Sequence, residues 1–69
     1  MKKISVVIPA HNEEGNISLI YQRIKVVFSK LENYRFEIIF VNDGSRDNTQ
    51  KVIEDLAQNH EEVKYIEFS

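Results

Sequence analysis

Two short polar stretches of the sequence contain the side chains that could bind a ligand. One is PAHNEE, residues 9–14, and the other is NDGS, residues 42–45, at the end of the apolar run IIFV. An ionised carboxylate only accepts hydrogen bonds, so Asp43 suits the imide or amino edge of a base, or ribose hydroxyls. Gly44 would let the backbone approach such a ligand closely.

Three apolar segments are predicted to be strands that position these stretches. Residues 4–8 are mostly β-branched and are followed by Pro9, which cannot donate to a strand ladder and marks a strand end. Residues 36–41 form a near-continuous apolar run, which is typical of a strand buried on both faces. Residues 63–68 alternate only in part, which favours a strand near a sheet edge.

Two amphipathic helices are predicted between these strands. The first has apolar residues at steps of three and four: Ile17, Ile20, Tyr21, Ile24, Val27, Phe28 and Leu31. Its cap would be Asn12 or Asn16, with Glu13 and Glu14 in the first turn. The second has a shorter stripe at Val52, Ile53, Leu56 and Ala57. Its cap would be Ser45 or Asp47, with Thr49 in the first turn and an end near Asn59 and His60.

The predicted fold is therefore α/β, a three-stranded parallel β-α-β-α-β unit, because helical crossovers of this length join parallel strands by right-handed connections. Parallel strands end at the same edge of a sheet, where ligands of open α/β sheets bind. We therefore expect the carboxylates of Glu13, Glu14 and Asp43 to converge there.

Composition excludes several classes of function. The 69 residues are 42% hydrophobic and 29% charged with a net charge of -2, which fits one globular unit and argues against nucleic acid as a partner. Cysteine is absent, which excludes disulfides and thiolate metal sites, and no segment reaches the roughly 20 apolar residues of a membrane span. A cytoplasmic protein is the default expectation. No glycine-rich phosphate motif follows the first strand.

The segments VVIPAHNEEGNI and EIIFVNDGSRDNT, at their spacing, resemble the amino-terminal half of family 2 glycosyltransferases with the GT-A fold. The sequences of these segments are most similar to those of the polyisoprenyl-phosphate branch, which includes dolichyl-phosphate mannose synthases and bactoprenol glucosyltransferases. The resemblance implies a Rossmann-like nucleotide-diphospho-sugar transferase fold, a UDP- or GDP-sugar donor and a polyisoprenyl phosphate as one acceptor. It places the whole enzyme at the cytoplasmic face of the membrane, in cell-wall or polysaccharide biosynthesis.

The family's Pro-x-Tyr-Asn-Glu pattern lines the base and ribose pocket and corresponds here to Pro9, His11, Asn12 and Glu13. His11 replaces the usual aromatic residue; imidazole can still stack on a base, but the preferred base is left open.

The family's Asp-Gly-Ser pattern corresponds to Asp43, Gly44 and Ser45, and its aspartate holds the base. By resemblance, the nucleotide-binding residues are Pro9, His11, Glu13, Asp43 and Gly44.

The resemblance also implies a divalent metal, Mg²⁺ or Mn²⁺, that stabilises the departing diphosphate. The family holds it with an Asp-x-Asp motif beyond the third strand, and the catalytic base follows later. The sequence ends at Ser69, before either, so residues 1–69 are expected to be a partial nucleotide-sugar-binding domain with no catalytic residue or metal ligand, inactive in isolation.

Simpler interpretations remain open. Asp43 could only shape a turn, Glu13 and Glu14 could only be helix-start charges, and His11 could be an ordinary loop residue. The chain could instead be a small nucleotide- or metal-binding α/β module. It could also only self-associate, through the apolar edge SVVI of the first strand or through exposed helix faces.

Overall fold

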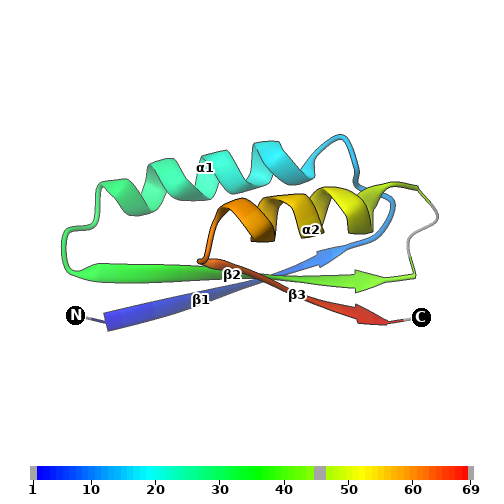
Figure 1. Cartoon of the computed structure of the whole chain (residues 1–69). Coiled ribbons are helices and arrows are strands. Elements are labelled where there is room, and N and C mark those ends of the chain that lie inside the picture. Colours follow the sequence, from blue (N-terminus) through cyan, green and yellow to red (C-terminus); the bar gives the residue numbers. More distant parts are fainter. Residues whose placement is uncertain (1, 45–46, 69) are drawn as a thin grey trace.

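The computed structural model describes residues 2–44 and 47–68, and it confirms the predicted α/β architecture (Figure 1). Five elements follow one another along the chain: β1 (Lys2–Ala10), α1 (Ile17–Ser29), β2 (Tyr34–Asp43), α2 (Thr49–Asn59) and β3 (Val63–Phe68). The strands form one sheet in the order β1-β2-β3, and both pairings are parallel. The edge position predicted for β3 is correct.

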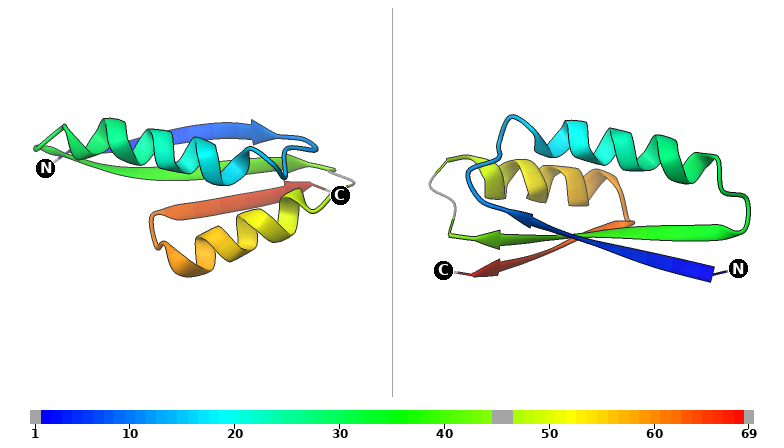
Figure 2. Two further views of the ribbon diagram at one scale, coloured as in Figure 1. Left: turned by 90° about the horizontal axis from the view of Figure 1, so that it is seen from above. Right: turned by 180° about the vertical axis from the view of Figure 1, so that it is seen from behind.

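Both helices cover the same face of the sheet (Figures 1 and 2). The reason is topological: both crossovers step in the same direction across the sheet, so connections of one hand place both helices on one side. All three strands point the same way, so their carboxyl ends lie at one edge, together with the loops that lead into the helices.

The first strand extends past Pro9, where the prediction ended it. Proline was expected to end the first strand, yet Pro9 lies inside β1 and pairs with Val41. Proline is tolerated there because β1 is hydrogen-bonded only to β2, and an edge strand can contain a residue without an N–H.

The prediction that residues 36–41 are buried on both faces is wrong for this chain. Ile38 and Phe40 face the helices and are fully buried, whereas Ile39 and Val41 on the other face are only half-buried. Their neighbours on that face include Val7, which is 60% exposed, and Phe68, which is 53% exposed. This apolar surface, with Ile66, is called the open face below.

The helix starts also depart from the prediction. Asn16 occupies the N-cap position of α1, so Glu13 and Glu14 precede the helix instead of forming its first turn. The helix ends at Ser29, and Val27 and Leu31, expected in the apolar stripe, are exposed.

The N-cap of α2 is Asn48, so the second helix begins one residue later than a cap at Asp47 and three residues later than a cap at Ser45 would place it. Asp47 still accepts a hydrogen bond from the Thr49 N–H, at 2.9 Å. Ser45, the other predicted cap, lies outside the described residues.

The core lies between the helices and the sheet, with fully buried Ile17, Ile38, Phe40 and Ile53 at its centre. A polar cluster, formed by Tyr21, His60 and Glu62, closes it near the start of β3. The Tyr21 hydroxyl donates to Glu62 Oε1 at 2.5 Å, and His60 Nδ1 lies 3.0 Å from the same hydroxyl. A hydroxyl has one hydrogen, so the His60 ring must donate.

Two groups of this cluster, Tyr21 and Glu62, have shifted pKa values. Burial, followed by the hydrogen bond to Glu62 and its negative charge, raises the pKa of Tyr21 from 10.0 to about 12. Burial alone would raise the pKa of Glu62, but the Tyr21 hydrogen bond, a backbone hydrogen bond and the charges of His60 and Lys25 outweigh it and lower the pKa. The hydrogen bonds of the cluster join α1 to the segment between α2 and β3.

Candidate functional site

A cleft of about 550 Å³ lies at the carboxyl edge of the sheet. Four of the five residues predicted to bind nucleotide line it: Pro9, His11, Glu13 and Asp43. Pro9 lies near the end of β1, His11 and Glu13 lie in the loop that follows, and Asp43 ends β2. The parallel pairing of β1 with β2 brings these segments together. Glu14 and Gly44 are not among the residues that line the cleft.

His11 joins the two loops directly. Its Nδ1 lies 2.8 Å from the carbonyl oxygen of Asp43, which can only accept, so Nδ1 carries the hydrogen and donates. The Asn12 amide nitrogen lies 3.3 Å from Nε2 of the same ring, in a position to donate to it. Asn12 has a positive φ of 55°, a left-handed conformation that asparagine tolerates better than most residues. The plane of the His11 ring is thus held at the cleft.

Glu13 is half-buried and its carboxylate is oriented from within its own loop. Asn16 Nδ2 donates to Glu13 Oε2 at 3.0 Å, and the Asn16 N–H donates to the Glu13 carbonyl at 2.9 Å. The Glu13 N–H crosses to the start of α2, where it donates to Thr49 Oγ1 at 2.7 Å.

Asp43 is the last residue of β2 and its side chain is exposed at the cleft. The next residue, Gly44, has φ +66° and donates its N–H to the Phe68 carbonyl at 3.1 Å. A Cβ added to Gly44 would meet no atom within 4 Å. The structure therefore supports a conformational reason for glycine, the left-handed turn out of the strand.

Asp47 and Thr49 hold the first loop from the other side. Asp47 Oδ2 accepts the Glu14 N–H at 3.3 Å, and Asp47 Oδ1 accepts from both the N–H and the hydroxyl of Thr49. The Thr49 hydroxyl is the main influence on Asp47 and lowers its pKa, with the backbone N–H groups of Thr49 and Glu14 adding to the effect.

Sequence reasoning missed three residues of the cleft, Ala10, Val41 and Phe68. Phe68 could have been found, because it ends β3, and a third parallel strand must end at the same edge as the other two. Ala10 lies in the stretch PAHNEE but carries no polar signal, and Val41 was hidden in the strand pattern of residues 36–41.

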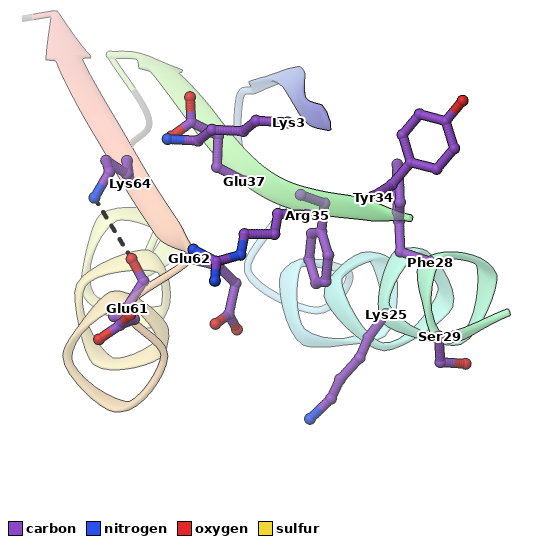
Figure 3. Close-up of a pocket in the computed structure, with 11 residues that line it drawn as sticks. Lys3, Lys25, Phe28, Ser29, Tyr34, Arg35, Glu37, Glu61, Glu62 and Lys64 are labelled. Atoms are coloured by element: carbon purple, nitrogen blue, oxygen red, sulfur yellow. Dashed lines mark hydrogen bonds and ion pairs between the residues drawn. The ribbon is translucent and has the colours of Figure 1, made fainter. Parts of the chain in front are cut away.

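A second, larger cleft of about 690 Å³ lies at the opposite edge of the sheet, near the starts of the strands (Figure 3). Cationic and anionic side chains alternate around it, including Lys3, Arg35, Glu37 and Lys64. Glu37 is already engaged by Ser5 at 2.6 Å and by Lys3 at 3.1 Å, and these hydrogen bonds, that of Ser5 first, lower its pKa. This mixture offers no field of one sign to select a charged ligand.

The described residues also bear on metal binding and on membrane crossing. Within residues 2–44 and 47–68, no group of three or more His, Asp or Glu side chains is placed to hold a metal ion. Across the same ranges, none of the helices combines the length and apolar character that crossing a bilayer requires.

The sequence of this chain is similar to those of known proteins. The model of glycosyl transferase family 2 matches residues 5–69. CsbB of Bacillus subtilis (strain 168), named as a candidate glycosyltransferase, is 47% identical over 66 residues, covering 96% of this chain and 20% of that protein. The prophage bactoprenol glucosyl transferase homolog of Escherichia coli (strain K12) is 40% identical over 67 residues, covering 97% and 22%.

The bactoprenol glucosyl transferase of Shigella phage SfX is likewise 40% identical over 67 residues, covering 97% of this chain and 22% of the relative. The chain thus spans about a fifth of the length of these relatives. Its three parallel strands and two helices correspond to the amino-terminal, Rossmann-like half of a GT-A fold. The chain belongs to glycosyl transferase family 2.

Proposed function

We propose that this chain binds the nucleoside part of a UDP- or GDP-sugar in the cleft at the carboxyl edge of the sheet. The observation that supports this most directly is that Pro9, His11, Glu13 and Asp43, from the end of β1, the loop after it and the end of β2, line one cleft. Its volume of about 550 Å³ lies within the range of small-molecule sites.

Each residue has a role that its chemistry allows. The exposed Asp43 carboxylate accepts hydrogen bonds from the base, and the Glu13 carboxylate, held by Asn16, accepts from ribose hydroxyls. Pro9 and the His11 ring form an apolar wall for the base, and Gly44 provides the turn that leaves Asp43 at the edge. Binding, and not sugar transfer, is the function assigned to these residues.

The whole protein would transfer the sugar to an acceptor, for which we propose a polyisoprenyl phosphate at the cytoplasmic face of the membrane. The support is that relatives of this chain include bactoprenol glucosyl transferases, such as that of Shigella phage SfX. Family members use a divalent metal, but the described residues do not form a group that fits one, so no step of this proposal uses a metal.

Titration of UDP and GDP into the labelled chain, followed by NMR, tests the nucleotide proposal. Asp43→Asn keeps the side-chain shape but replaces one acceptor oxygen by a donor, so we expect at least an about tenfold weaker affinity. Asp55→Asn, the same change on an exposed position of α2, is the matched control and should bind as the unmodified chain does. Equal affinities for all three proteins would remove Asp43 from the site.

We also propose that the isolated chain self-associates. The open face and the unpaired edge of β1 are apolar, and Val26 and Val27 of α1 are exposed as well. Sedimentation across a concentration series measures this, and a single monomeric species at every concentration would contradict it.

A further inference from the structure

We propose that Thr49 and Asp47 are positioning residues that fix the Glu13 loop against the Asp43 loop and so preform the cleft. This inference rests on the proposed function, because it assigns these residues an effect on nucleotide affinity. Neither side chain lines the cleft, so their action is through the backbone of the opposite loop.

Two consecutive backbone amides of the loop after β1 are held by the side chains of Thr49, the first residue of α2, and Asp47, which lies just before α2. The Glu13 N–H donates to Thr49 Oγ1 at 2.7 Å, and the Glu14 N–H donates to Asp47 Oδ2 at 3.3 Å. With the His11–Asp43 hydrogen bond at 2.8 Å, these contacts bridge the two loops at three successive places along the edge. Movement of the loop after β1 away from these partners would weaken the three hydrogen bonds.

The Thr49 hydroxyl is suited to this task because it accepts and donates at the same time. It accepts from the Glu13 N–H and donates to Asp47 Oδ1, and it is fully buried, so water cannot replace it. Serine keeps both functions, whereas valine keeps the shape and loses both. Comparison of the two variants therefore distinguishes the effect of the Thr49 hydroxyl from the effect of side-chain packing.

Helix capping alone does not account for the arrangement. A cap requires only that Asp47 accept the N–H of Thr49 within its own segment, and Asp47 Oδ1 does so at 2.9 Å. In addition, Asp47 Oδ2 accepts the Glu14 N–H and Thr49 Oγ1 accepts the Glu13 N–H, and both amides belong to the loop after β1. The same two residues therefore serve α2 and the cleft.

The test measures amide hydrogen exchange and UDP and GDP affinity on the same 69-residue chain. In Thr49→Val we expect the Glu13 amide to exchange faster and the nucleotide Kd to rise, each by about fivefold or more, whereas Thr49→Ser should stay within about twofold. In Asp47→Asn, where one acceptor oxygen remains for Thr49, we expect faster exchange at Glu14. Ser18→Ala removes an exposed hydroxyl near the start of α1 and serves as control.

The outcomes separate the two proposals. Unmodified chain that binds neither nucleotide refutes the proposed function and, with it, the effect on affinity, while the exchange of Glu13 and Glu14 still tests the hydrogen bonds. If Thr49→Val and Thr49→Ser change exchange and affinity equally, or if neither changes them, the positioning role is refuted. Should Thr49→Val fail to fold, Asp47→Asn decides: unchanged Glu14 exchange and unchanged Kd overturn the inference.

Discussion

Replacement of Tyr21 by phenylalanine should change the pH dependence of stability as well as its size. Tyr21 is only 4% exposed and gives its hydroxyl hydrogen to Glu62 Oε1 at 2.5 Å. Near neutral pH, loss of a hydrogen bond to a charged, partly hydrated carboxylate should lower the free energy of unfolding by about 1–2 kcal/mol.

At alkaline pH the difference in unfolding free energy between the unmodified chain and Tyr21→Phe should shrink or change sign. The folded pKa of Tyr21 is raised from 10.0 to about 12, so the stability that this group provides is complete below pH 10 and is lost as pH rises toward 12. The loss is about 1.4 kcal/mol per pH unit, or about 2–3 kcal/mol over the interval. Tyr21→Phe has no such group and should lack this part of the decline.

Urea denaturation at a series of pH values, followed by circular dichroism, measures both effects. Tyr34→Phe, at a position that is 39% exposed, is the matched control and should not alter the alkaline slope. Tyrosinate absorbance provides an independent check, because Tyr21 should ionise at a pH well above its unfolded-state pKa of 10.0. A constant difference between Tyr21→Phe and the unmodified chain across the whole alkaline range would refute the reasoning.

Other predictions concern single sites. Phe40→Ala empties a fully buried position and should cost about 3–5 kcal/mol, close to the whole stability of a small domain; a retained cooperative urea transition would contradict this. Gly44→Ala should lower the free energy of unfolding by about 1 kcal/mol, because alanine is strained at a φ of +66°. Gly44→Asn should lower it less, and thermal unfolding measures both. Val7→Lys should change stability by no more than about 0.5 kcal/mol but reduce association in sedimentation. The lowered pKa of Glu62 adds stability above its ordinary 4.5 that is lost on acidification, so Glu62→Gln should flatten the acid limb of urea stability.

Much of the fold followed from periodicity, because strand and helix patterns alternated and crossover helices require parallel strands. Strand direction then placed Glu13 and Asp43 at one edge, which was the main geometric prediction about the site. The order of the strands was not available from these patterns. That order decides that both helices cover one face, and for this reason the apolar run through Ile39 and Val41 was wrongly taken as buried on both sides.

Contacts between loops were beyond sequence reasoning. Asp47 and Thr49 were read as parts of a helix start, since local spacing shows only what a residue can do within its own segment. Their bonds to Glu13 and Glu14 depend on how closely two loops approach at the sheet edge. The left-handed turn at Gly44 was likewise given a different reason, close approach of a ligand.

The parallel pairing of β1 with β2 has a consequence for synthesis of the chain. Each partner strand is reached only after a whole helix has been made, so no strand contact can form by local chain closure. On the ribosome, β1 must therefore wait as an apolar, unpaired segment until β2 has emerged from the exit tunnel. The nascent chain is most exposed to chaperones and to misassembly during that interval, before any of its sheet exists.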